Sequence, residues 1–185
     1  MVTISFKDGT LLLDEPRDTK LPITEFCVYD VRVNAWRAEA FRYADIVMAL
    51  YRNGIKYDDR ARNYATLNLR HRTLHKPRDY QMQAVEAWKA ASRRGVIVLP
   101  TGTGKSFVAQ MAIACCNRST FVVVPTLDLM DQWARQLSSA FGREIGLLGG
   151  GSKDLRDLTV STYDSAVLMM ESIGNRIGLL VIDEC

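Results

Sequence analysis

The stretch that decides the fold is VIVLPTGTGKSF, residues 96–107. Its apolar beginning, residues 96–100, predicts a short buried strand, and a helical pattern begins at Phe107. Between the two, Gly102 and Gly104 allow the backbone to curl into a nest of N–H donors that approaches a phosphate group closely. A strand, a glycine-rich loop and a helix in this order are typical of a phosphate-binding loop.

Side chains at the end of this loop predict an ATP and magnesium site. Lys105 is placed to reach the β- and γ-phosphates, and the Ser106 hydroxyl is placed to bind Mg²⁺. The N-terminus of the following helix adds the positive end of its dipole. The loop residues expected to bind ATP are Thr101, Gly102, Thr103, Gly104, Lys105 and Ser106. The alternative is a glycine-rich turn in an unrelated α/β fold.

The other half of the site is predicted by LLVIDE, residues 179–184, in which two acids follow a buried strand. Asp183 at the strand tip is expected to hold Mg²⁺, and Glu184 to orient and deprotonate the attacking water. We therefore predict Lys105, Asp183 and Glu184 as catalytic residues, and Ser106 and Asp183 as metal ligands. Alternatively, Asp183 caps a turn and Glu184 is a surface acid.

Upstream of this region, residues 1–58 predict a small α+β domain. Asp8 and Gly9 predict a hairpin turn between two strand-like runs. Residues 26–36 alternate apolar and polar side chains as one half-buried strand does, and residues 44–53 have helical spacing. The aromatic side chains of this domain fit a core or a stacking surface for DNA bases equally well; they are Phe26, Tyr29, Trp36, Phe41 and Tyr43.

Residues 59–77 are expected to form a basic linker. Between Arg60 and Arg78 the chain has no acidic residue, and its basic residues are Arg60, Arg62, Arg70, Arg72, Lys76 and Arg78. Such a run can neutralise DNA phosphates, and it can equally be a solvated connection.

From residue 78 to residue 185, apolar strands alternate with helices, which is typical of βαβ units and a parallel sheet covered on both faces. Asp79 is expected to cap the first helix and Gly95 to end it. The expected helices are 78–95, 104–116, 127–141 and one from residue 163, and the expected strands are 96–100, 120–124, 145–151, 158–162 and 178–183. The predicted fold class is therefore α/β, preceded by the small α+β domain.

Composition excludes several other classes of protein. Of the 185 residues, 48% are hydrophobic and 24% are charged, as in a soluble globular protein, and the net charge of +3 does not by itself indicate nucleic acid. The longest apolar runs are about six residues, far below the roughly 18–20 that cross a bilayer. The beginning of the chain lacks a secretory signal, and the 4 cysteines lack metal-type spacing. We expect free thiols and an intracellular protein, cytoplasmic if prokaryotic.

Six motifs in one order resemble the first half of an XPB-type superfamily 2 helicase. They are RDYQ (78–81), LPTGTGKS (99–106), VVPTLDLMDQW (123–133), the glycine pair 149–150, STYDS (161–165) and IDE (182–184). The general phosphate-loop pattern has Gly at position 99, and the form with Leu99 resembles the helicase variant. The resemblance is strong from residue 78 onward and looser over the N-terminal domain, where AFRYADIVMALYRNGI (40–55) carries it.

This resemblance implies a RecA-like domain of the P-loop NTPase class, with ATP and Mg²⁺ as cofactors. Gln81 would read the adenine edge, with Arg78 or Tyr80 beside the base. A solvent-facing helix position is the alternative for Gln81. The residues that would follow the phosphates of one DNA strand are Pro125, Thr126, Gly149, Gly150, Thr162 and Tyr163. Ordinary turn chemistry is the alternative for this set.

The resemblance also implies partners and a reaction. In archaeal members the N-terminal domain is proposed to sense damaged DNA, so duplex or damaged DNA is expected there and a single strand across the RecA-like domain. A nuclease or a transcription or repair complex is a further expected partner. The implied function is an ATP-dependent DNA helicase or translocase in nucleotide excision repair or transcription.

The end of the chain adds one expectation and leaves two alternatives. Cys185 would be the third residue of the family's D-E-x-H motif, and the histidine and the second RecA-like domain do not follow. We expect the nucleotide-binding half of a motor that alone binds ATP weakly, if at all, and barely hydrolyses it, with a frayed strand tip at Asp183. The alternatives are a DNA-binding module with an idle nucleotide site and a fragment of another superfamily 2 translocase acting on duplex DNA.

Overall fold

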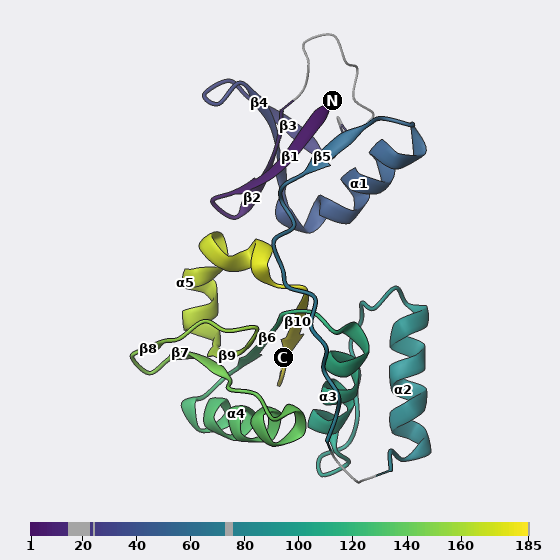
Figure 1. Ribbon diagram of the computed structural model, residues 1–185, viewed down its shortest axis with the longest axis vertical. Coiled ribbons are helices and arrows are strands. Elements are labelled where there is room, and N and C mark those ends of the chain that lie inside the picture. Colours follow the sequence, from purple (N-terminus) through teal and green to yellow (C-terminus); the bar gives the residue numbers. More distant parts are fainter. Residues whose placement is uncertain (15–22, 24, 73–75, 185) are drawn as a thin grey trace. The chain divides into compact units, whose positions relative to one another are not determined.

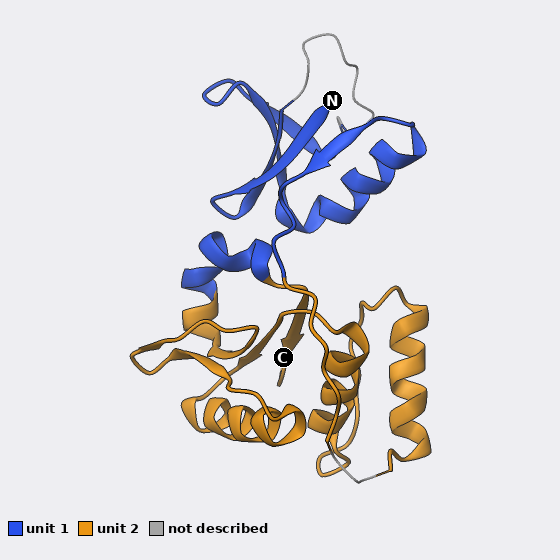
Figure 2. Ribbon diagram, viewed as in Figure 1, with its two compact units in different colours: residues 1–64, 167–176 blue, residues 65–166, 177–185 orange. Residues whose placement is uncertain are grey.

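The computed structural model describes residues 1–14, 23, 25–72 and 76–184, which form two compact units. Unit 1 consists of Met1–Tyr64 and Val167–Arg176, and unit 2 consists of Ala65–Ala166 and Ile177–Cys185 (Figure 2). Cys185, the expected third residue of the D-E-x-H motif, lies outside the described residues. No helix in the described ranges combines the length and the apolar character needed to span a membrane.

Unit 1 contains a five-stranded sheet with the order β3-β4-β2-β1-β5 (Figure 1). Its strands are β1 (Val2–Lys7), β2 (Thr10–Asp14), β3 (Cys27–Asp30), β4 (Ala35–Glu39) and β5 (Tyr57–Asp59), and its helical elements include η1 (Ala40–Arg42), α1 (Tyr43–Arg52) and η2 (Gly174–Arg176). The hairpin predicted at Asp8 and Gly9 is confirmed. Both residues have left-handed φ angles, +49° and +75°, as a tight two-residue turn between antiparallel strands requires.

The core of unit 1 lies between α1 and the sheet. Ile46 and Leu50 of α1 are fully buried, and they pack with Ile4, Leu11 and Leu13 of the β1–β2 hairpin. The helical spacing expected over residues 44–53 is therefore confirmed, and it is the buried face of α1 that produces it.

The single strand expected over residues 26–36 is wrong. The chain turns after Asp30, Asn34 has a left-handed φ of +52°, and β3 pairs antiparallel with β4. The turn is held by Asp30, which accepts hydrogen bonds from the backbone and the guanidinium of Arg32. The alternating pattern continues through the turn, where Val31 is 79% exposed, and for that reason it did not reveal the turn.

Unit 2 contains a sheet with the order β10-β6-β9-β7-β8, flanked by helices (Figure 1). Its strands are β6 (Thr120–Val124), β7 (Gly146–Gly149), β8 (Ser152–Lys153), β9 (Leu158–Thr162) and β10 (Leu179–Ile182), and the helices are α2 (Asp79–Ala90), α3 (Lys105–Cys116), α4 (Leu127–Phe141) and α5 (Tyr163–Ile173), whose residues from 167 belong to unit 1. The strands β10, β6, β9 and β7 are parallel, and β8 is antiparallel to β7. The predicted α/β class with a parallel sheet is confirmed.

The core of unit 2 is built on β6 and α4. Every residue of β6 is buried, which explains why this strand is a continuous apolar run and does not alternate. Trp133 of α4 packs in the same cluster as Val122. Thr126 caps the start of α4, and Gly142 follows its end with a left-handed φ of +61°, so the predicted bounds 127–141 are confirmed.

The strand expected over residues 96–100 is wrong. In the described parts of the chain this segment pairs with no strand, and Val96 and Val98 are 79% and 87% exposed. Ile97 packs against buried residues of α2 and α3. An apolar run predicts a strand, but a strand also needs a hydrogen-bonded neighbour, which the local pattern does not report.

Helix α2 differs from expectation at both ends. Arg78 is its N-cap in place of Asp79, and the helix ends at Ala90, ahead of the glycine that was expected to stop it. Ser92 and Arg93 have left-handed φ angles of +58° and +61°, which a right-handed helix does not accommodate.

The described part of residues 59–77, which were expected to form a basic linker, contributes buried residues to the cores of both units. Residues 73–75 lie outside the described residues. Ala61 is buried in the core of unit 1 and Leu69 in the core of unit 2. The backbone N–H groups of Leu67 and Leu69 donate to the carbonyl and the side-chain oxygen of Asn117 at 2.7 and 2.6 Å. Apolar residues placed among the basic ones thus attach this stretch to each unit.

Candidate functional site

The predicted phosphate loop is a turn that leads directly into α3. Gly102 and Gly104 have φ angles of +77° and +84°, in the left-handed region that glycine adopts without strain. Gly104 is the N-cap of α3, and because it has no side chain it cannot cap the first N–H groups of the helix. The Thr103 hydroxyl braces the loop by donating to the Pro100 carbonyl at 2.6 Å.

Residues at the start of α2 hold this loop from one side. The Thr103 carbonyl accepts hydrogen bonds from the Tyr80 hydroxyl at 2.7 Å and from Nε2 of Gln81 at 2.9 Å. Oε1 of Gln81 accepts from the Arg78 backbone N–H at 2.9 Å, and Nη1 of Arg78 donates to the Tyr80 hydroxyl at 3.2 Å. Gln81 is buried, so the solvent-facing alternative does not hold. The structure therefore brings Arg78 and Gln81 to the loop.

The strand tip that carries the two acids is anchored at Asp183. Its backbone N–H donates to the Val123 carbonyl at 2.9 Å, and its carbonyl accepts from the Tyr163 hydroxyl at 3.0 Å. Its side-chain Oδ2 accepts from the indole Nε1 of Trp133 at 2.7 Å. The frayed tip expected at Asp183 is therefore wrong. Glu184 is exposed and has a left-handed φ of +58°.

These residues fit a magnesium nucleotide. Lys105 and Ser106 occupy the first turn of α3, where the helix dipole favours phosphate. The Ser106 hydroxyl and the Asp183 carboxylate are hard oxygen donors of the kind that Mg²⁺ prefers. Among the described residues, no three or more His, Cys, Asp or Glu side chains form a metal cluster. Few protein ligands are expected for Mg²⁺, which takes substrate phosphates and water as well.

One hydrophobic cluster joins α2, α3, the segment before the phosphate loop and the start of β10. Trp88 of α2 packs with Ala112 and Cys116 of α3. Two partly buried residues pack against them, Leu179 of β10 and Ile97 of the segment before the phosphate loop. Burial raises the pKa of the Cys116 thiol, which therefore stays neutral and inert. The cluster ties the segment before the phosphate loop to the strand that ends in the acids.

The residues expected to contact DNA lie at or directly after the carboxyl ends of β6, β7 and β9, and these three strand ends lie close together. A Cβ added to Gly149 would lie 3.1 Å from Oγ1 of Thr162, and one added to Gly150 would lie 3.0 Å from Cδ2 of Leu127, the residue after Thr126. Pro125 precedes this group and Tyr163 follows it along the chain. The structure therefore brings the members of the predicted DNA set together along one edge of the parallel sheet.

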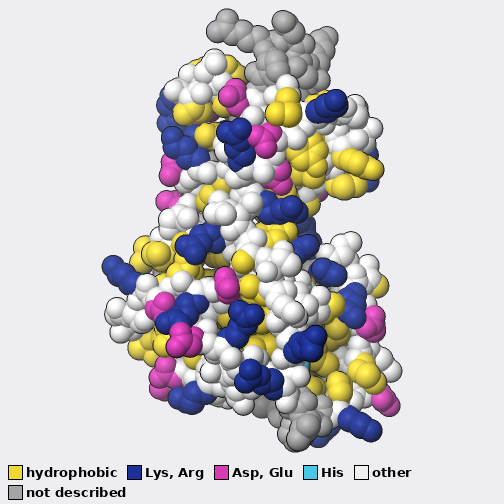
Figure 3. Space-filling model, in the orientation of Figure 1, with side chains coloured by type: hydrophobic (Ala, Val, Ile, Leu, Met, Phe, Trp, Pro, Cys, Tyr) yellow, Lys and Arg dark blue, Asp and Glu magenta, His cyan; other side chains and the backbone are white. Residues whose placement is uncertain are grey.

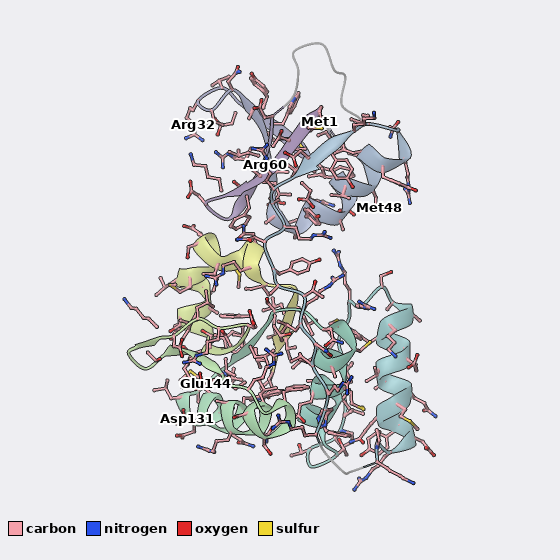
Figure 4. The ribbon with its side chains drawn as sticks, in the orientation of Figure 1. Met1, Arg32, Met48, Arg60, Asp131 and Glu144 are labelled. Carbon is pink, nitrogen blue, oxygen red and sulfur yellow. The ribbon has the colours of Figure 1, made fainter. Side chains whose placement is uncertain are left out.

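Two threonine hydroxyls in this set also serve the helices that they precede. Oγ1 of Thr126 accepts from the Leu129 backbone N–H at 3.3 Å, and Oγ1 of Thr162 donates to the Ser165 hydroxyl at 3.1 Å. The alternative of ordinary turn chemistry therefore applies to both threonines. The Thr126 hydroxyl accepts in this contact, so its own proton is still available for donation. Asp131 on α4 and Glu144 after it are exposed and acidic (Figure 4), and Asp128 places a further exposed acid in the first turn of α4.

The aromatic residues of unit 1 divide between core and surface. Phe26, Trp36 and Tyr43 pack against the core, whereas Tyr29 and Phe41 are 43% and 63% exposed. Three of the five aromatic residues are thus part of the fold, and two are left for contact with a partner.

Trp133 is the site residue that the sequence analysis missed. Helical spacing places it on the buried face of α4 with Met130 and Leu137, which predicts packing and nothing more. Its hydrogen-bond partner, Asp183, is distant in sequence, and no local pattern connects the two.

Comparison with known proteins gives two family models in the order of the two regions of the chain. Residues 4–61 match the Xeroderma pigmentosum group B helicase damage recognition domain, and residues 74–185 match the type III restriction enzyme, res subunit. The DNA 3'-5' translocase XPB2 of Sulfurisphaera tokodaii is 37% identical over 152 residues, 82% of this chain and 34% of the relative. The DNA 3'-5' helicase XPB of Mycobacterium tuberculosis is 38% identical over 89 residues, 46% of this chain and 16% of the relative. The protein of that name from Kineococcus radiotolerans is 37% identical over 90 residues, 46% of this chain and 16% of the relative.

A parallel α/β sheet, a glycine loop at the start of α3 and an acidic strand tip define a RecA-like domain of the P-loop NTPase class. With a helicase-type model over residues 74–185 and a damage-recognition model before it, the chain belongs to the XPB-type superfamily 2 helicases. The matched region spans about one-third of the length of the Sulfurisphaera relative, at 34%, and less of the other two.

Proposed function

We propose that this chain is the nucleotide-binding part of an ATP-dependent DNA helicase or translocase that acts in nucleotide excision repair or transcription. It binds ATP through residues 101–106 with Arg78 and Gln81, and Mg²⁺ through Ser106 and Asp183. One DNA strand crosses the loops that follow β6, β7 and β9. The printed names of the relatives, DNA 3'-5' helicase and translocase, support this reaction.

One observation carries the proposal. The loops after three parallel strands converge at Gly149, Gly150 and Thr162, next to the start of α4. Hydroxyls and glycine backbone N–H groups are the donors with which proteins hold phosphates without reading bases. Their convergence at the carboxyl edge of a parallel sheet, where such sheets bind ligands, supports a continuous track for one strand. The drawn face of unit 2 carries Lys and Arg side chains interspersed with Asp and Glu side chains (Figure 3).

The residues of the nucleotide site have separate roles in this proposal. The Lys105 ammonium group stabilises charge on the γ-phosphate, and the exposed Glu184 carboxylate accepts a proton from the attacking water. Gln81 uses one donor and one acceptor of its amide on Thr103 and Arg78, and its second N–H and remaining lone pairs serve the adenine edge. Ser106 and Asp183 would hold Mg²⁺, which would supply neutralisation of the charge that develops on the phosphates.

Unit 1 supplies a second DNA contact in this proposal. The match of residues 4–61 to a damage-recognition domain supports duplex or damaged DNA as its partner. The exposed rings of Tyr29 and Phe41 are the stacking candidates, and Arg42 lies 5.0 Å from the centre of the Phe41 ring. A nuclease or a transcription or repair complex is the proposed protein partner of the whole enzyme.

Substitution of Thr162 tests the proposed DNA track. Either hydroxyl of the Thr162–Ser165 pair can be the donor, so the Thr162 proton can turn to a phosphate when Ser165 donates in its place. Thr162→Val removes this hydroxyl at constant shape and should weaken binding of a fluorescent single-stranded oligonucleotide about fivefold, the equivalent of roughly 1 kcal/mol for one hydrogen bond. The control is Thr120→Val, at the opposite end of β6, where Oγ1 donates to the Arg118 carbonyl. Fluorescence anisotropy that gives equal affinities for both variants and the unchanged chain would contradict the proposed track.

A further inference from the structure

Asp183 is held by the same elements that form the proposed DNA track. Its carboxylate accepts from Trp133 of α4, and its carbonyl accepts from Tyr163, the first residue of α5. Helix α4 begins directly after Thr126, and Tyr163 directly follows Thr162. Both hydrogen bonds to the expected metal ligand therefore start from elements that begin at a proposed DNA contact.

Trp133 and Asp183 form a hydrogen bond between a buried indole N–H group and a carboxylate oxygen. Trp133 is 2% exposed, and its ring packs in the core of unit 2 with Met130 and Leu137. An indole has a single N–H donor, and a buried donor without a partner is strongly unfavourable. Because the acceptor at 2.7 Å is a carboxylate oxygen, the bond is charge-assisted. Trp133 and the carboxylate of Asp183 therefore fix each other's position.

This bond restricts the carboxylate in a way that matters for a metal ion. The indole donates to Oδ2, which limits rotation of the carboxylate and leaves Oδ1 outside this hydrogen bond. Partners that orient a metal-binding group in this way typically change metal affinity when they are removed.

Helix α4 also touches the second loop of the DNA track. A Cβ added to Gly149 would lie 3.2 Å from Sδ of Met130, which lies one turn before Trp133 on the same buried face. Helix α4 therefore connects the residues around Thr126 and Gly149 directly to the indole of Trp133.

We propose that Trp133 and Tyr163 are positioning residues that connect the DNA track to Asp183, so that a bound nucleic-acid strand changes the affinity of the site for a divalent metal–nucleotide complex. This inference rests on the proposed function of the same site. Linkage makes the effect reciprocal, because a strand that changes metal–nucleotide affinity has its own affinity changed by the same factor.

The test uses the full chain of 185 residues with Mn²⁺ as the spectroscopic substitute for Mg²⁺. Free Mn²⁺ is followed by electron paramagnetic resonance in the presence of ADP, with and without a single-stranded oligothymidine. In the unchanged chain the oligonucleotide should alter Mn²⁺ affinity by about fivefold or more. Trp133→Phe should lower Mn²⁺ affinity about tenfold or more and bring the oligonucleotide effect close to onefold, while oligonucleotide affinity without metal stays unchanged.

Two further variants separate positioning from packing. Trp88→Phe is the control, since Trp88 is a buried tryptophan of a different cluster, and it should keep the oligonucleotide effect. Tyr163→Phe keeps its ring and should reduce the effect even if Trp133→Phe fails to fold. Because Tyr163 also belongs to the predicted DNA set, the effect of this variant is read at saturating oligonucleotide, with its oligonucleotide affinity measured separately without metal. Circular dichroism establishes that each variant is folded.

The outcomes distinguish this inference from the proposed function. If the unchanged chain binds no oligonucleotide or no Mn²⁺–ADP, the proposed function is wrong, and the inference, which rests on it, is wrong as well. If the unchanged chain binds both, and Trp133→Phe and Tyr163→Phe keep its Mn²⁺ affinity and oligonucleotide response, the inference alone is overturned.

Discussion

Gly104 is important both for the backbone of the phosphate loop and for the contact of this loop with α2. Its φ of +84° lies in the left-handed region, and a Cβ added to it would lie 2.7 Å from Nε2 of Gln81. That nitrogen is the atom that donates to the Thr103 carbonyl. A side chain at residue 104 would therefore strain the backbone and break the contact that holds the phosphate loop against α2.

A comparison of two loop glycines isolates this contact. Gly104→Ala should lower the free energy of unfolding by about 2 kcal/mol, because left-handed strain and a lost hydrogen bond combine. Gly102→Ala should lower it by about 1 kcal/mol, since strain acts alone there. Gly102 has a φ of +77°, and within the described part of the chain a Cβ built on it meets no atom within 4 Å. Urea denaturation followed by circular dichroism measures the free energy of unfolding of both variants. Equal decreases in the two variants would contradict a stabilising role for the hydrogen bond from Gln81 to the Thr103 carbonyl.

Helix α4 shows which elements a sequence predicts well. Thr126 at its start, Gly142 after its end and the apolar spacing between them all indicate the same bounds, and the structure has those bounds. The segment 96–100 and the turn after Asp30 are different cases. The first needs a pairing strand and the second a change of direction, and neither is part of the hydrophobic pattern from which they were predicted.

The N-cap of α4 has a structural role that is separable from its proposed contact with DNA. Thr126→Ala should lower the free energy of unfolding by about 1 kcal/mol, because the Leu129 N–H loses its acceptor. Thr126→Ser keeps the cap hydroxyl and should restore both stability and oligonucleotide affinity. Denaturant unfolding and fluorescence anisotropy on the same samples check this. A serine variant as unstable as the alanine variant would show that the methyl group, and not the cap, stabilises the helix.

Across the whole molecule, the sequence predicts a set of site residues but not the contacts between them. The order of motifs identifies Lys105, Asp183 and the loops after the strands. Their contacts depend on the sheet order β10-β6-β9-β7, in which strands distant in sequence are neighbours. The bond from Trp133 to Asp183 follows from that order, as does the approach of Gly149 to Thr162, and neither has a local signal.

In the proposed function, this chain holds a magnesium nucleotide between the phosphate loop and Asp183. The most direct test is the binding of a fluorescent ATP analogue, titrated with and without Mg²⁺, to the unchanged chain and to Lys105→Ala. We predict saturable, Mg²⁺-dependent binding that weakens at least about tenfold in Lys105→Ala, equivalent to roughly 1.4 kcal/mol, while oligonucleotide affinity and circular dichroism stay unchanged. Equal, Mg²⁺-independent binding by the two proteins, or no binding by the unchanged chain, would contradict the claim.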